Sequence, residues 1–171
     1  MVSLGNYKID GGEKYWQHLC GGAILSNKAI LTAAHCTHTS NAKPYLIRAG
    51  DEYLNTPDDD ETAQDYEINT AIKHGDYNLN KENDVAIIAV KGEMTFNDRT
   101  RPICYPKTAN ADGNDLADHG VRLAGWGIED DMFYRDNDSL KEIMLTVRPQ
   151  SYCESFYPGF SDVIICAGEE V

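Results

Sequence analysis

Residues 31–36 read Leu-Thr-Ala-Ala-His-Cys and end an apolar stretch that starts at Gly22 and is broken once, by polar residues 26–28. Short apolar runs on either side of a polar turn predict the two strands of a β-hairpin. His35 and Cys36 would then lie at the end of the second strand. Cys20 lies just before the first strand, so a bond between the two cysteines would close the hairpin beside His35.

A second stretch, Asn-Asp-Val-Ala-Ile-Ile at residues 83–88, places an acid directly before a continuous apolar strand. We expect the Asp84 carboxylate to be buried, and a buried carboxylate is costly unless it is paired and hydrogen-bonded. A histidine ring N–H is one available donor. Taken alone, His35 also fits a structural residue with a fixed partner.

A third stretch, Ala-Gly-Trp-Gly, follows at residues 124–127. With these three motifs in this order, nearly the whole chain resembles the trypsin-like (chymotrypsin-fold) serine proteases. The resemblance implies an all-β fold of two antiparallel barrels. Residues 1–118 would form a nearly complete first barrel with the connection between the barrels, and residues 119–171 would start a second, truncated one.

The same resemblance implies a Ser-His-Asp triad in a secreted serine endopeptidase that needs no cofactor. His35 would be the general base, and Asp84 would fix the tautomer of its imidazole. The family's Gly-Asp-Ser-Gly-Gly motif is absent from the 171 residues, as is an activation terminus like Ile-Val-Gly-Gly. We therefore expect a fragment of a longer protein, truncated at both ends and inactive alone. Four serines sit in loop or cap contexts and none is assigned as the nucleophile: Ser139, Ser151, Ser155 and Ser161.

Five cysteines are present, an odd number for a chain read as secreted. The resemblance implies the bridges Cys20–Cys36 and Cys153–Cys166. Cys104, in Arg-Pro-Ile-Cys-Tyr-Pro at residues 101–106, matches the position from which many family members bridge to a light chain or pro-domain. The alternative is a free surface thiol.

Residues 51–65 are predicted to form an acidic loop with seven carboxylates. A calcium ion would relieve their mutual repulsion, since calcium accepts oxygen ligands in irregular geometry. Asp51 and Glu61 fall where some family members place acidic calcium ligands, which makes them the candidate metal ligands. A solvated acidic loop without a metal is the alternative.

The formal charge of −13 argues against nucleic acid or an anionic membrane as partner, because either surface would repel the chain. A protein or peptide substrate remains the expected partner. No apolar run is long enough to span a bilayer. If the chain is secreted, Asn137-Asp-Ser is an N-glycosylation acceptor pattern.

Three other functions compete with an active protease. A non-catalytic homologue would keep His35 and Asp84 but replace the nucleophile and serve as a binding or regulatory scaffold. A zinc module is suggested by five residues near one hairpin: His18, Cys20, His35, Cys36 and His38. It is the weaker idea, because adjacent residues of a strand point to opposite faces. A disulfide-stapled structural domain would leave the acid at Asp84 unexplained.

Further strands are predicted at residues 45–50, 66–73, 84–91, 121–128, 140–147 and 163–168. Asp10-Gly-Gly is predicted as a hairpin tip at residues 10–12. Ser151 and Glu154 have the spacing of a capping box that would start a short helix at about Tyr152. Ser3 and His18 match a family pair that helps to hold the uncleaved zymogen inactive, and His18 also fits a packed strand residue.

Overall fold

The computed structural model describes residues 1–37, 45–56, 61–78, 82–105, 116–127, 139–156 and 165–168. The chain forms two compact units, one of residues 1–104 and 125–140 and the other of residues 105–124 and 141–171. This grouping places residues 105–118 and 125–140 differently from the division predicted at residue 118. Asn137 and His38 lie outside the described residues.

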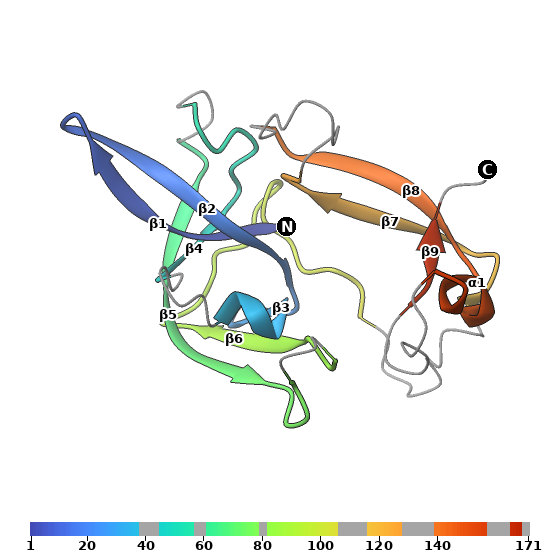
Figure 1. Ribbon diagram of the computed structural model, residues 1–171. Coiled ribbons are helices and arrows are strands. Elements are labelled where there is room, and N and C mark those ends of the chain that lie inside the picture. Colours follow the sequence, from blue (N-terminus) through green and yellow to red (C-terminus); the bar gives the residue numbers. More distant parts are fainter. Residues whose placement is uncertain are drawn as a thin grey trace. The chain divides into compact units, whose positions relative to one another are not determined.

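The first unit is a closed antiparallel barrel in the strand order β1-β2-β3-β6-β5-β4 (Figure 1). Its strands are β1 (Val2–Asp10), β2 (Glu13–Ile24), β3 (Ala29–Thr32), β4 (Leu46–Ala49), β5 (Gln64–Lys73) and β6 (Ala86–Val90). Pairing of β1 with β4 closes the sheet, so no strand of the barrel is left as an edge. The prediction of an all-β barrel fold is confirmed.

The interior of the barrel is filled mainly by branched aliphatic side chains. They come from alternate residues, because successive residues of a strand point to opposite faces. Every second residue of β3 and of β6 is buried, and Ile30 of β3 lies opposite Ile88 of β6. The buried core consists of Val2, Leu4, Ile24, Ile30, Ile47, Ala49, Ile88, Val90 and Met94. Full burial of one such large side chain contributes roughly 1.5–3 kcal/mol, so this core is a major source of stability for the unit.

The β1–β2 hairpin continues through the polar residues on both sides of the predicted tip. The two strands pair up to Asp10 and Glu13. Gly11 and Gly12 form the tip, with φ of 60° and 93°, a conformation that glycine adopts without strain. Polar side chains do not prevent pairing here, because the outer part of the ribbon is exposed on both faces.

The described part of the second unit holds a three-stranded sheet in the order β7-β8-β9. Its strands are β7 (Gly120–Gly125), β8 (Lys141–Val147) and β9 (Ala167–Gly168), and a short helix, α1 (Gln150–Glu154), follows β8. The predicted capping box is wrong, since α1 begins at Gln150 after Pro149 and has no side-chain cap. Pro149 fixes the φ that leads into the first turn, at −54°, and leaves Ser151 inside the helix.

Across the described residues, none of the helices combines the length and the apolar character needed to cross a membrane.

Candidate active site

The pairing of β3 with β6 brings two distant chain segments to one point. Thr32, the last residue of β3, lies opposite Ala86, the first residue of β6. His35 therefore lies three residues beyond the end of one strand, and Asp84 lies two residues before the start of its antiparallel neighbour. Both side chains emerge at the same end of the strand pair, although 49 residues separate them.

A single turn of 3-10 helix, η1 (Ala34–Thr37), carries His35. The Cys36 N–H donates to the Ala33 carbonyl at 3.2 Å, and the Thr37 hydroxyl donates to the Ala34 carbonyl at 2.7 Å. Cys36 is also bonded to Cys20 of β2, with a Cα–Cα distance of 6.0 Å. The turn is thus held to the barrel on both sides of the histidine.

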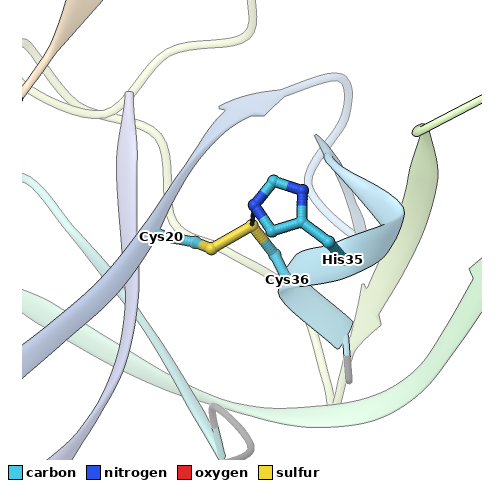
Figure 2. A group of neighbouring side chains, drawn as sticks. All are labelled: Cys20, His35 and Cys36. Carbon is cyan, nitrogen blue, oxygen red and sulfur yellow. Dashed lines mark hydrogen bonds between the residues drawn. A yellow bond between two sulfur atoms is a disulfide. The ribbon is translucent and has the colours of Figure 1, made fainter. Parts of the chain in front are cut away.

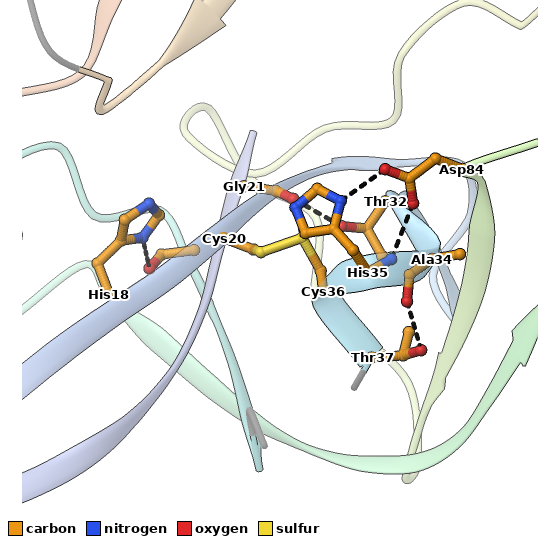
Figure 3. The surroundings of a disulfide bond; sticks show 10 residues. His18, Cys20, Gly21, Thr32, Ala34, His35, Cys36, Thr37 and Asp84 are labelled. Atoms are coloured by element: carbon orange, nitrogen blue, oxygen red, sulfur yellow. Dashed lines mark hydrogen bonds and ion pairs between the residues drawn. A yellow bond between two sulfur atoms is a disulfide. The ribbon is translucent and has the colours of Figure 1, made fainter. Parts of the chain in front are cut away.

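Asp84 contacts His35 through both carboxylate oxygens (Figure 3). Its Oδ2 lies 2.6 Å from the ring Nδ1, and its Oδ1 accepts from the His35 backbone N–H at 2.8 Å. An ionised carboxylate only accepts hydrogen bonds, so Nδ1 must carry the proton. In the neutral ring this leaves the lone pair on Nε2. The Asp84 side chain is 19% exposed and that of His35 is 45% exposed, so the carboxylate is mostly buried and the imidazole is reachable from solvent.

The pKa of Asp84 reflects opposing influences. Burial is the largest single influence and raises this pKa. Three influences lower it: the hydrogen bond from the His35 ring, those from the backbone N–H groups of His35 and Ala34, and the charge of the nearby imidazole. Together they outweigh burial and hold the pKa below its ordinary value of 3.8. Asp84 is therefore ionised at neutral pH.

Asn83 sets the direction of Asp84 and was missed as a site residue. Its φ is 54°, in the left-handed region, and its carbonyl accepts from the Val85 N–H at 2.8 Å. Asparagine is among the few non-glycine residues that visit this region readily. The Asn-Asp dipeptide before an apolar strand was therefore a usable signal for a tight turn.

The second ring nitrogen of His35 faces the disulfide. Nε2 lies 3.5 Å from Cys36 Sγ. Figure 2 marks this contact with a dashed line. Within the described residues, no serine hydroxyl is hydrogen-bonded to this nitrogen. The prediction that His35 and Cys36 lie on opposite faces of a strand is wrong, because the two residues lie in a 3-10 turn.

Ser3 and His18 are in contact, as part of a buried group on β1 and β2. Ser3 Oγ lies 2.7 Å from His18 Nδ1 and accepts from Trp16 Nε1–H at 2.8 Å. Because the tryptophan can only donate, the serine proton is free to point to His18. The His18 ring in turn lies 5.5 Å from the ring of Trp126, which itself donates to the Glu52 carbonyl.

The two candidate calcium ligands differ in environment. Asp51 has a side chain only 1% exposed, and its Oδ2 lies 2.5 Å from Arg48 Nε. Glu61 is exposed. Asp65, predicted in the same loop, belongs to β5 and accepts from the Tyr7 hydroxyl at 2.5 Å. A buried arginine thus already neutralises Asp51, and calcium binding at this loop stays a prediction.

The other three cysteines form one disulfide and leave one unbridged thiol. Cys153 of α1 is bonded to Cys166 just before β9, and the two bridges are the pairs that the resemblance implies. Cys104 is exposed and is not part of a disulfide.

The fold and the site together define a class. A closed six-stranded antiparallel barrel that carries a hydrogen-bonded His–Asp pair beside a disulfide is the first half of a chymotrypsin-type protease. The family model described as Trypsin matches residues 4–170. The chain therefore belongs to the trypsin family.

Curated relatives agree with this assignment. A venom protease of Bombus pensylvanicus is 32% identical over 98% of this chain and 68% of its own length. The proclotting enzyme of Tachypleus tridentatus is 31% identical over 87% of the chain and 42% of its own length. The Spaetzle-processing enzyme of Drosophila melanogaster is 30% identical over 89% of the chain and 43% of its own length. The chain thus spans less than half of the latter two proteins.

Proposed function

We propose that this chain supplies the histidine and the aspartate of a secreted serine endopeptidase. The observation that carries the proposal is the contact of His35 Nδ1 with Asp84 Oδ2 at 2.6 Å, reinforced by the backbone bond at 2.8 Å. This geometry fixes one tautomer and leaves Nε2 as the basic nitrogen. A general base for a serine hydroxyl needs that lone pair in reach of solvent and substrate.

The proposed reaction is peptide-bond hydrolysis through an acyl-enzyme. Nε2 of His35 would take the proton of the nucleophilic serine during attack on the carbonyl and return it to the leaving amine. Asp84 would stabilise the imidazolium formed in between. The serine is proposed to follow Val171, in the family's Gly-Asp-Ser-Gly-Gly motif, together with the amides of the oxyanion hole. The mechanism requires no cofactor.

The partners proposed for the intact protein follow from the same assignment. Its substrate would be a protein or peptide, in line with the proclotting enzyme and the Spaetzle-processing enzyme among the relatives. An exposed, unbridged Cys104 supports a bridge to a cysteine of an N-terminal light chain or pro-domain. Secretion is supported by the two disulfides, which persist in oxidising compartments, and it would make Asn137 a glycosylation candidate.

A fluorophosphonate that labels activated serines tests the proposal on the intact gene product. We expect one labelled serine and loss of labelling in His35→Ala. His74→Ala is the matched control, because the His74 side chain is also 45% exposed and pairs with Asp76 at the surface. Labelling that survives His35→Ala would contradict the proposed base.

The alternative is a non-catalytic homologue that uses the barrel as a binding or regulatory scaffold. It is kept because the 171 residues contain no nucleophile motif. A folded intact protein that binds no fluorophosphonate, with another residue at the nucleophile position, would favour it. The 171-residue chain by itself is expected to hydrolyse ester substrates no faster than buffer, and burst release of product that depends on His35 would refute this expectation.

A further inference from the structure

Three metal-binding donor atoms meet at the end of β3. Those of Cys20, His35 and Cys36 lie within 4.8 Å of one another. Figure 2 shows the imidazole over the bridge between the two sulfurs, with one ring nitrogen directed at Cys36. In the oxidised chain the sulfurs are bonded and cannot act as thiolates. We propose that reduction of the Cys20–Cys36 bridge converts this cluster into a zinc site, with both thiolates and His35 Nε2 as ligands.

The distances suit tetrahedral zinc. With Zn–S near 2.3 Å and Zn–N near 2.0–2.1 Å, the tetrahedral angle puts a sulfur and a nitrogen about 3.5 Å apart and two sulfurs about 3.8 Å apart. The distance from His35 Nε2 to Cys36 Sγ is already 3.5 Å. After reduction the two sulfurs must separate, and Cys20 Sγ, which lies within 4.8 Å of the other two donor atoms, must come to about 3.5 Å from Nε2. Cys20 is partly exposed and can turn aside, whereas Cys36 is 4% exposed and stays next to the ring.

Asp84 prepares the histidine for this role. Zinc-bound histidines usually donate their other ring N–H to a carboxylate, which fixes the tautomer and raises the basicity of the ligand. His35 has this arrangement in the structure, with Nδ1 at 2.6 Å from Asp84 Oδ2. Nε2 presents a lone pair, because a disulfide sulfur has no proton to share with it. Zinc would therefore displace no proton from the ring.

The chemical steps balance with a dithiol as the reductant. One thiolate of the dithiol attacks Cys20 Sγ, the more exposed sulfur, and Cys36 leaves as a thiolate. The second dithiol sulfur then releases Cys20, so that two protein thiols and one cyclic disulfide are formed. A zinc ion replaces the two thiol protons, binds Nε2 and keeps a fourth position for water or an external ligand. Two cysteines and one histidine with an open position are a ligand set that zinc enzymes use.

One consequence depends on the proposed protease function. Zinc would occupy the lone pair that the general base needs, so the same nitrogen cannot serve both purposes. Where a dithiol reduces the bridge, zinc binding would then switch off the intact enzyme, whereas in an oxidising compartment the bridge would persist. The metal site itself does not depend on the protease proposal, because it needs only residues of this barrel.

Cobalt(II) is a suitable probe of the site, since thiolate-to-cobalt charge-transfer bands report sulfur ligands and intense d–d bands report tetrahedral geometry. The 171-residue chain is used with Cys104, Cys153 and Cys166 all changed to alanine, so that Cys20 and Cys36 are the only thiols. After dithiol treatment and removal of the dithiol, we expect one tetrahedral cobalt per chain, displaced by zinc. The oxidised chain should bind none.

Variants separate the proposed site from unspecific thiol binding. Asp84→Asn should weaken cobalt binding about 10–100-fold, as loss of such a supporting carboxylate does elsewhere. His35→Ala should weaken it at least as much and alter the d–d bands. The matched control keeps Cys153 and Cys166 and changes Cys20, Cys36 and Cys104 to alanine, and after reduction it should give no tetrahedral spectrum.

Amide hydrogen exchange shows whether the reduced chain is folded. Protection of β3 and β6 in the cobalt complex supports the proposal, even if the metal-free reduced chain is unprotected, because binding can then drive folding. The proposal is overturned if no tetrahedral spectrum forms, if β3 and β6 are unprotected in the complex, or if His35→Ala binds cobalt as the parent does.

Discussion

The two units of the chain differ in how fully the centres of their sheets bury apolar side chains. In the barrel, Ile30 and Ile88 are fully buried, whereas Leu123 of β7 and Met144 of β8 are 61% and 57% exposed. The barrel sheet closes on itself through the β1–β4 pair, while β7 and β9 end the three-stranded sheet in the described part of the second unit. Closure covers one face of every strand, and an open sheet needs a second layer to do the same.

The candidate site lies on the unit whose sheet is closed and better packed. His35 and Asp84 are attached to β3 and β6, whose inner faces form the barrel core. The geometry of the pair therefore depends on contacts within the first unit. We expect the His–Asp contact to persist even when the second unit opens locally, since local unfolding spares well-packed elements.

The largest contrast is expected from truncating one side chain in each unit. Ile88→Ala should lower the free energy of unfolding by about 2–5 kcal/mol, because it leaves a cavity in the barrel core. Leu123→Ala should change it by less than about 0.5 kcal/mol, as exposed substitutions usually do. Urea denaturation followed by tryptophan fluorescence measures both. Equal losses would mean that β7 is covered in solution.

A second contrast uses glycine instead of core side chains. A Cβ at Gly5 would lie 2.2 Å from the Gln17 carbonyl oxygen and 2.7 Å from the Trp16 ring. Neither can retreat easily, so Gly5→Ala should cost about 1–3 kcal/mol. A Cβ at Gly120 would meet the flexible end of Met144 at 3.3 Å, so Gly120→Ala should be nearly neutral. Thermal unfolding of both variants checks the pair, and a neutral Gly5→Ala would show that the ribbon can shift its register.

Much of the barrel could be predicted from the sequence, because several of its strands are short apolar runs bounded by polar residues. The hairpin break at residues 26–28 and the apolar runs around Ile30 and Ile88 carried enough pattern to place β3 and β6. That pattern did not show the full length of β1 and β2, since an exposed ribbon lacks apolar alternation. It also misplaced the start of α1, where Pro149 rather than a serine cap begins the helix.

The candidate site was accessible to sequence reasoning only in part. An acid before an apolar strand suggested that Asp84 needs a partner, and the motif order pointed to His35. The contact between His35 Nε2 and Cys36 could not be foreseen, because it depends on a 3-10 turn. The apolar run before His35 predicts a strand at this point instead. The Arg48–Asp51 pair was missed for a similar reason: an acidic loop suggests solvent, not a buried partner on the preceding strand.

A third, smaller effect concerns acid stability in the barrel. The folded chain holds the pKa of Asp84 below its ordinary value of 3.8. Its contribution to stability is therefore complete above about pH 4 and is lost as the pH falls through the lower folded pKa. We expect Asp84→Asn to lower the free energy of unfolding at pH 7 by an amount on the order of 1 kcal/mol, since the imidazole is half exposed. The decline in stability below pH 4 should be flatter in this variant.

Glu67→Gln is the control for this acid effect. The pKa of Glu67 is also lowered, mainly by its hydrogen bond to Lys91, but both side chains of this pair are exposed. Salt should screen that interaction, so at high ionic strength Glu67→Gln should follow the parent curve. Denaturant midpoints between pH 2 and pH 7 give the comparison, and an unchanged acid decline in Asp84→Asn would contradict the assigned role of this carboxylate.

The smallest effect is expected from calcium at the predicted acidic loop of the first unit. Asp51 already has a buried cationic partner, so an ion at Asp51 and Glu61 must compete with Arg48 for the same carboxylate. With a dissociation constant near the 10⁻⁴–10⁻³ M typical of weak extracellular sites, millimolar calcium would add only about 0.4–1.4 kcal/mol, and the competition favours the lower end. Melting temperatures with calcium and with chelator measure the gain.

Glu61→Gln is the sharper variant, because Glu61 is exposed, whereas changing Asp51 would also leave Arg48 without its buried partner. A calcium-dependent rise that disappears in Glu61→Gln supports the site. A rise that persists in that variant, or no rise at all, leaves Asp51 as the buried partner of Arg48 and Glu61 as an ordinary surface acid.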